Sequence, residues 1–185
     1  MKRNIVDHIM ARVDKNNSQE IERELMSYLN ENHDPSLLNL EAKKDCRTLK
    51  EYAVLNKWED LLCIIVTKYP EVSSYQDKHG NTMLHDCASH GLSTPLIKAL
   101  ETDENYALVK NKAGMTFLHI AGINGLKRVI TKAHEVDPML LAIKDDNGNT
   151  ALSLAYKFNV SYTPDTIKDL LDRRREEINT KREDI

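Results

Sequence analysis

Apolar residues recur at helical spacing along most of the chain. Near the N-terminus, residues 5–13 and 21–29 place Ile, Leu, Val and Met at intervals of three and four, which predicts two amphipathic helices. Further apolar runs predict later helices that face a core, at 61–65, 96–100, 129–130 and 167–171. The pattern therefore predicts an all-α chain.

A six-residue motif recurs with a constant step. Residues 80–85, which read GNTMLH, return 34 residues later as GMTFLH at 114–119 and again 34 residues later as GNTALS at 148–153. One step before Thr82 stands Thr48, although Cys46 and Lys50 occupy the places of the glycine and the leucine. The segment around Thr48 is therefore a degenerate fourth copy.

The residues of the unit separate two families of the same period, because tetratricopeptide repeats also span 34 residues. Residues 77–91 resemble the ankyrin unit, a turn with glycine followed by T-P-L-H-x-A-A-x-x-G, and the tetratricopeptide Trp/Leu-Gly/Tyr pattern is absent. Met83, Phe117 and Ala151 replace the proline of the ankyrin pattern. The resemblance covers roughly residues 45 to 160. It implies an ankyrin-repeat solenoid of helix-turn-helix units with β-hairpin-like tips and helical caps.

The register divides the chain into three segments. Residues 1–43 are expected to form a divergent N-terminal helical cap, and residues 44–171 the ankyrin repeats. Residues 172–185 contain two Ile and no other large apolar residue, so we expect a polar helix end or tail. Such a solvated end is what a terminal repeat needs for solubility.

The recurrent residues of the motif have expected structural roles. The glycine suits a tip that needs positive φ, and the threonine can cap the following helix by accepting from a backbone N–H, which is worth about 1 kcal/mol. The resemblance implies that the leucine packs between units and that the histidine bonds across neighbouring tips. The structural residues are expected to be Gly80, Thr82, Leu84, His85, Gly114, Thr116, Leu118, His119, Gly148, Thr150 and Leu152.

Charge and composition argue against several classes of partner. The 26 basic and 29 acidic side chains leave a net charge of −3, which gives no global attraction to nucleic acid or to an anionic membrane surface. No apolar run has the length of a membrane span, and charged residues interrupt any signal-peptide core. Three cysteines without a C-x-x-C pair favour a reducing compartment, so a cytoplasmic protein is expected.

Potential metal ligands gather at His79, His85, Cys87 and His90. The register separates them, since His85 and Cys87 fall in the seam between units while the other two fall on exposed positions. Structural zinc needs four converging ligands, so no metal site is predicted. Cys63 lies in an apolar run and Cys87 in the seam between units, which disfavours a thiolate at both, and only Cys46 is expected to be exposed. The sequence predicts neither a cofactor nor an enzyme. A metal- or thiol-dependent enzyme is kept only as a third functional hypothesis, after the two that are given below.

The resemblance implies a protein-binding module, expected to be monomeric, that holds its partner on the concave face of the solenoid. Lysines that recur at the 34-residue step would stack along successive tips, which predicts an acidic protein segment as the partner. The partner-facing positions, matched one by one to the family pattern, are Lys78, His79, Asn81, Ser89, His90, Lys110, Lys112, Met115, Ile123, Asn124, Lys144, Asp146, Lys157 and Phe158.

A second hypothesis is a secreted bacterial effector or adaptor that is delivered into a host cytosol. The chain is rich in Lys and Asn, and its C-terminal segment carries Glu176, Glu177 and Glu183, which resembles some type IV secretion tails. A solvated cap explains the same segment, so both interpretations stay open.

Overall fold

The computed structural model describes residues 7–9, 11–13, 17–32, 34–40 and 47–158. The elements of this part of the chain are α-helices and short 3-10 helices, and no β-strand is found among them. The predicted all-α class is therefore confirmed for the described residues.

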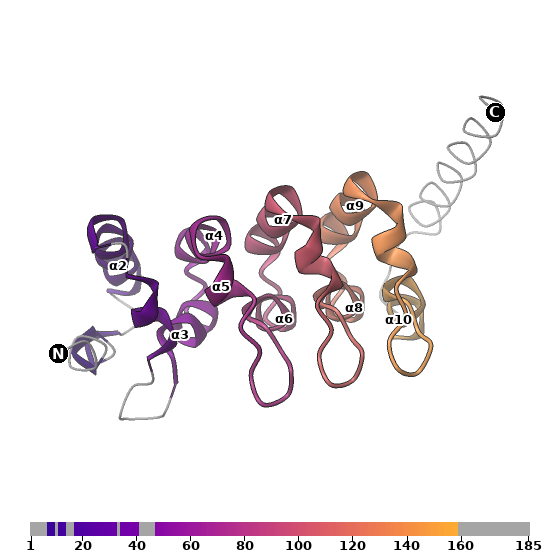
Figure 1. Ribbon diagram of the computed structural model, residues 1–185, viewed down its shortest axis with the longest axis horizontal. Helices are drawn as coiled ribbons and strands as arrows, with labels where there is room; N and C mark the ends of the chain where they lie inside the picture. Colours follow the sequence, from indigo (N-terminus) through magenta and orange to yellow (C-terminus); the bar gives the residue numbers. More distant parts are fainter. Residues whose placement is uncertain (1–6, 10, 14–16, 33, 41–46, 159–185) are drawn as a thin grey trace.

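The helices lie in two rows along the long axis of the molecule (Figure 1). The outer row consists of α2 (Ser18–Asn32), α4 (Glu59–Lys68), α7 (Ser93–Thr102) and α9 (Lys127–Val136). The inner row consists of α3 (Leu49–Leu55), α6 (Met83–Ser89), α8 (Phe117–Ile123) and α10 (Ala151–Lys157). Short helices follow the outer row, namely η1 (Pro35–Asn39), α5 (Pro70–Ser73), η2 (Glu104–Leu108) and η3 (Pro138–Ala142). Each helix contacts the next helix of its own row.

The helices keep the 34-residue step of the sequence. The inner helices α6, α8 and α10 begin at residues 83, 117 and 151, and the degenerate copy stays in register because α3 begins at Leu49. The outer helices α4, α7 and α9 begin at residues 59, 93 and 127. Corresponding positions of the described units can therefore be compared residue by residue.

A threonine stands before each of these inner helices. At α3, Thr48 Oγ1 accepts from the backbone N–H of Glu51, and the Glu51 carboxylate accepts from the Thr48 N–H at 2.6 Å. At α10, the backbone N–H groups of Thr150 and Ser153 each donate to the other residue's hydroxyl. Both pairs form a reciprocal cap that satisfies backbone donors at the start of a helix.

Helix α2 packs on α4 and buries Ile21, Leu25 and Leu29 of its predicted apolar stripe. The Trp58 indole N–H donates to Ser18 Oγ at 2.7 Å, and the Glu22 carboxylate accepts from the backbone N–H of Leu61 at 3.1 Å. The second bond satisfies a free donor in the first turn of α4. Side chains of α2 therefore take part in the structure of the next unit.

Leucines of the motif fill the seam between units. Leu84 and Leu118 are buried, whereas Leu152 on α10 is half-buried. Gly122 of α8 lies directly against the Ala151 carbonyl of α10, where a Cβ atom would collide with that oxygen. The small residue therefore sets how closely α8 and α10 approach.

Turns join the outer row to the following inner helices, and we call them the first, second and third tips (residues 77–81, 111–115 and 145–149). In each tip the backbone N–H of the first residue donates to the carbonyl of the fifth residue, at 2.8–2.9 Å. Each tip glycine has a positive φ between 69° and 78°. The tips are thus closed like hairpins, although they contain no strand.

Several expectations lie outside the described residues. They concern Cys46, the outer helix expected around residues 167–171 and the polar segment 172–185. Among the described residues, no helix has the length and apolar character needed to span a membrane.

Candidate protein-interaction surface

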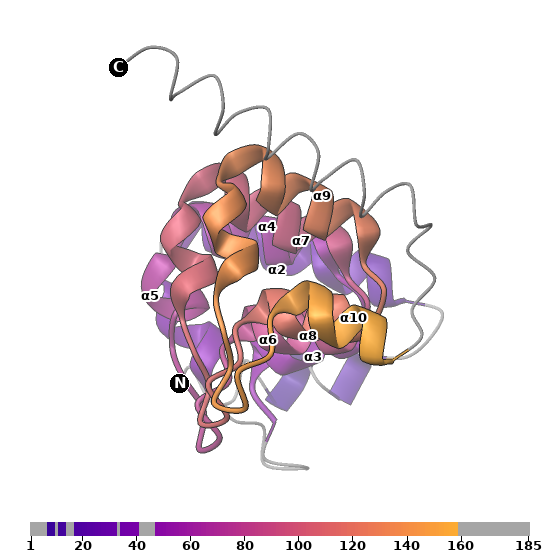
Figure 2. The same cartoon turned by 90° about the vertical axis from the view of Figure 1, so that its right-hand side faces the viewer.

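The tips project to one side of the inner row (Figure 2). We call the surface formed by the tips and the exposed sides of α3, α6, α8 and α10 the inner face. The partner-facing positions predicted from the sequence lie in or next to the tips and the inner helices. Of the residues predicted to face a partner, three are half-buried, namely Asn81, Met115 and Ile123. The others are exposed: Lys78, His79, Ser89, His90, Lys110, Lys112, Asn124, Lys144, Asp146, Lys157 and Phe158.

Each tip is held in shape by the side chain of its first residue. Asp77 Oδ1 accepts from the backbone N–H groups of His79 and Asn81, both at 2.8 Å. Asn111 and Asp145 make the same pair of bonds in the second and third tips. These three residues were not predicted from the sequence, although an Asp or Asn three positions before each tip glycine is a readable turn signal.

Neighbouring tips are bonded to each other through the backbone. The Lys112 N–H donates to the His79 carbonyl at 3.0 Å, and the Asp146 N–H donates to the Ala113 carbonyl at 3.3 Å. Gly80 lies so close to the second tip that a Cβ atom would be 2.9 Å from Lys112 N. The three tips therefore form one connected wall.

Side chains add a second set of bonds along this wall. Gln76 Nε2 donates to the Lys110 carbonyl at 2.9 Å, and Lys110 Nζ donates to the Lys144 carbonyl at 2.8 Å, which repeats the bond one unit later. On the helix side, Asn124 Nδ2 donates to the Ala88 carbonyl at 3.1 Å. Lys110 and Asn124 therefore bond to neighbouring units, although both were predicted to face a partner.

Two histidines connect the inner helices to the following tips. The Thr82 N–H donates to His85 Nδ1 at 3.1 Å, and His85 Nε2 lies 3.0 Å from the Met115 carbonyl. His119 makes the corresponding contacts, at 3.0 Å and 3.2 Å. Because a backbone N–H can only donate, Nδ1 accepts and Nε2 carries the proton. Each imidazole is therefore neutral, caps its own helix and holds the next tip.

Acid should destabilise the protein through these two histidines. Burial lowers the pKa of His85 and of His119 below the ordinary value of 6.5. As the pH falls through 6.5 the unfolded chain binds protons first, so the free energy of unfolding decreases until the lowered folded pKa is reached. Asp86 acts in the opposite direction, because burial and nearby carboxylates raise its pKa to about 6 and the folded state binds its proton first.

The double variant His85→Gln with His119→Gln isolates the histidine contribution. Glutamine can accept from the threonine N–H and donate to the carbonyl, but it does not titrate. Urea unfolding at about pH 7.5 and about pH 5.5 should show a larger loss of stability in the wild type than in the variant, because all other groups cancel in the difference. Equal losses would contradict the neutral, bonded state of the histidines.

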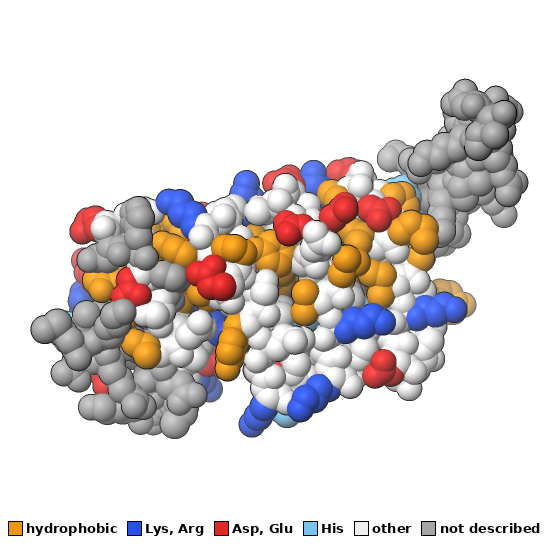
Figure 3. Space-filling view, viewed as in Figure 1, with side chains coloured by type: hydrophobic (Ala, Val, Ile, Leu, Met, Phe, Trp, Pro, Cys, Tyr) orange, Lys and Arg blue, Asp and Glu red, His pale blue; other side chains and the backbone are white. Residues whose placement is uncertain are grey.

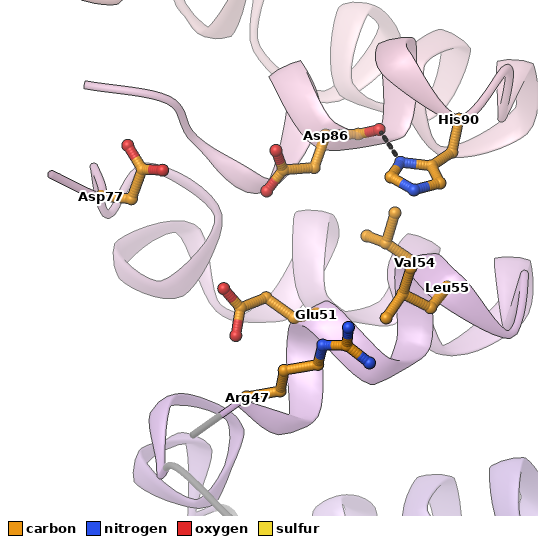
Figure 4. A pocket seen from close by; sticks show the side chains of 7 residues that line it. All are labelled: Arg47, Glu51, Val54, Leu55, Asp77, Asp86 and His90. Atoms are coloured by element: carbon orange, nitrogen blue, oxygen red, sulfur yellow. Dashed lines mark hydrogen bonds between the residues drawn. The ribbon is translucent and has the colours of Figure 1, made fainter. Parts of the chain in front are cut away.

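A crevice of ≈ 220 Å³ opens on the inner face between α3 and α6. Figure 4 shows carboxylates on one side of it and apolar side chains, an arginine and a histidine on the other. The residues that line it are Arg47, Glu51, Val54, Leu55, Asp77, Asp86 and His90. Only His90 was predicted as a partner-facing residue. The other crevice residues belong to the degenerate copy, apart from Asp77 in the first tip and Asp86 on α6.

The degenerate copy also places a lysine in the core. Lys50 stands at the position of Leu84 and is only 8% exposed, and its ammonium lies 4.4 Å from the centre of the Tyr75 ring. Burial lowers the pKa of Lys50, while Glu51, Asp86 and Asp77 partly oppose that shift. The carboxylates of the crevice therefore already have a positive charge beside them.

The described cysteines do not provide a thiolate. Burial raises the pKa of the half-buried Cys63 to about 11 and the pKa of the fully buried Cys87 well above its usual value. Both thiols therefore stay protonated at neutral pH, which disfavours them as nucleophiles. In the described part of the chain, no group of three or more His, Cys, Asp or Glu side chains is arranged to hold a metal ion.

Neither a scan against protein-family models nor a search of the curated proteins finds a match for the chain. Its function therefore has to be inferred from the geometry of the inner face.

Proposed function

We propose that the chain is an ankyrin-repeat solenoid that acts as a protein-binding module through its inner face. One observation carries this proposal: bonded structural residues recur along the inner face, whereas the exposed residues between them change from unit to unit. At one helix position of this face, for example, the successive units carry Leu55, Ser89, Ile123 and Lys157, of which Ile123 is half-buried and the others are exposed. A constant frame with variable exposed side chains is suited to recognising a partner surface.

The bonds between units support a preformed surface. The tips are bonded to each other through the backbone, and His85 and His119 bond α6 and α8 to the tips that follow them. A surface that is already ordered loses less conformational entropy on binding than one that must be ordered by its partner. The inner face can therefore use its contacts for affinity.

The remaining features of the proposal are a monomeric state, a cytoplasmic location and the absence of enzymatic activity. Neutral thiols at Cys63 and Cys87 support the last of these. The bacterial effector hypothesis depends on residues 172–185, which lie outside the described residues, so no observation favours it over simple protein binding.

Position-specific photocrosslinking tests the proposal in cells. A photoreactive amino acid at Ser89 and, separately, at Ile123 should crosslink the same partner protein, because both positions lie on the inner face. The control is Lys98 on α7, an exposed position of the outer row. Crosslinks that form at Lys98 but at neither inner-face position would contradict the proposed binding surface.

A further inference from the structure

The inner face changes character along its length. In the first two described units, the crevice brings together positions from α3, α6 and the first tip. Because the helices keep the 34-residue step, the corresponding positions of later units line the same face. The position of Asp86 is taken by Ile120 in the next unit. The position of Leu55 is taken by Ser89 and then by Ile123. The position of His90 is taken by Asn124 and then by Phe158. The helices of this face therefore carry carboxylates beside Val54 and Leu55 at α3 and α6, whereas α8 and the end of α10 place the apolar side chains of Ile120, Ile123 and Phe158 there without a helix carboxylate.

These apolar side chains are accessible. Phe158 is 55% exposed at the end of α10, whereas Met115, Ile120 and Ile123 are each half-buried and expose only part of their side chains, with Ile120 also packed against the core. Exposed apolar side chains that share one face are a common mark of a protein-binding site. The aromatic ring of Phe158 can contribute more buried area on binding than a smaller side chain.

Lysines border the same part of the inner face. Lys112 lies in the second tip, Lys144 next to the third tip and Lys157 on α10, and all three are exposed. The Lys110 ammonium is held at this wall by its bond to the Lys144 carbonyl. Figure 3 shows basic side chains along the edge that the tips form. Asp146 in the third tip is an exposed acidic side chain beside them.

We propose that the half of the inner face formed by α8, α10 and the second and third tips binds an acidic amphipathic segment of a partner protein. This inference rests on the function proposed above and names the class of partner and its place. Apolar side chains of the segment would cover Ile120, Ile123 and Phe158, while its carboxylates would face Lys112 and Lys144.

The carboxylates of the crevice set the limit of this footprint. Glu51, Asp77 and Asp86 would repel an acidic segment that extended over α3 and α6, and like charges brought together at an interface oppose binding. A basic segment is disfavoured on the half formed by α8 and α10, because it would meet the lysines of the tips there. Within the crevice it would also meet Arg47 and the buried Lys50 beside the same carboxylates.

The proposal can be tested with the full chain and a library of random linear peptides displayed on phage. Peptides enriched on the wild type should combine acidic with apolar residues. A selected peptide should bind the Lys112→Glu, Lys144→Glu double variant about tenfold more weakly at low salt, with a smaller difference at physiological salt. Lys98→Glu, a single reversal of a lysine on the outer row, is the control for position and should leave the affinity within about twofold.

Two further measurements give the location and the role of the apolar side chains. The selected peptide should shift the backbone amide resonances of α8 and α10 in the wild type and leave those of α3 unchanged. Phe158→Ala should mainly increase the rate of peptide dissociation, because contacts made after the encounter determine how long a complex lasts. Circular dichroism of every variant checks that the fold is retained.

Several outcomes would contradict this inference. Enrichment of basic peptides that shift the amide resonances of α3 and α6 would overturn the acidic partner and leave the proposed function standing. Displacement of the selected peptide by single-stranded DNA would show that the lysines recognise phosphate rather than an acidic segment. The absence of any enriched peptide would also count against the inference. Peptides that bind only to α4, α7 and α9 would contradict the proposed function itself.

Discussion

Leu118→Ala is expected to lower the free energy of unfolding by about 2–5 kcal/mol. The Leu118 side chain is fully buried between units, so its truncation removes apolar contacts and leaves a cavity in the seam. In a repeat array much of the stability comes from the interfaces between neighbours, so the loss should weaken both sides of the unit. Urea unfolding followed by circular dichroism measures the change.

Leu152→Ala is the matched control. It removes the same atoms at the same position one unit later, but Leu152 is only half-buried. We therefore expect a smaller loss for Leu152→Ala than for Leu118→Ala. Equal losses, or an unchanged unfolding curve for Leu118→Ala, would show that the 34-residue register does not describe the packing of the inner row.

Gly114→Ala is expected to produce the second large effect. Gly114 has a φ of +69°, where an L side chain costs about 1–2 kcal/mol. A Cβ atom there would also lie 2.6 Å from Asp146 N in the third tip, so backbone would have to move. Such overpacking adds about 1–3 kcal/mol. The total loss should therefore approach that of a buried leucine.

Gly148→Ala separates the two contributions to this effect. Gly148 has a φ of +78°, but a Cβ atom at this position meets nothing within 4 Å. Its substitution should therefore show the backbone strain alone, about 1–2 kcal/mol. The difference between the two variants in thermal or urea unfolding reports the packing of one tip against the next. Equal losses of stability in the two variants would contradict the close packing of the second tip against the third.

Local features of the molecule were readable in the sequence. Helical spacing of apolar residues predicted the all-α class, and the recurring threonines mark where α6, α8 and α10 begin. These features depend on residues a few positions apart, so a linear pattern contains them. The same reasoning could have found Asp77, Asn111 and Asp145, whose carboxyl or amide groups bond to backbone only two and four residues away.

The degenerate copy shows where a repeat pattern misleads. Comparison with the later units suggested only a weakened version of the same unit at α3. In the structure, Lys50 at the leucine position and Glu51 at the histidine position adjoin Asp77 and Asp86, and a crevice opens beside them. The crevice depends on side chains from two units that face one another, which the degenerate copy alone does not reveal.

The sequence by itself determined the helical class of the described residues, the 34-residue step and the residues that begin each inner helix, because these depend on short-range spacing and local capping. Only the tertiary structure decided which exposed groups bond to neighbouring units. Lys110 and Asn124 fit the partner-facing pattern, yet they bond to carbonyls 34 and 36 residues away. Whether such groups meet depends on how closely stacked units approach, and that distance is set by the packing of small residues such as Gly122 rather than by any local pattern.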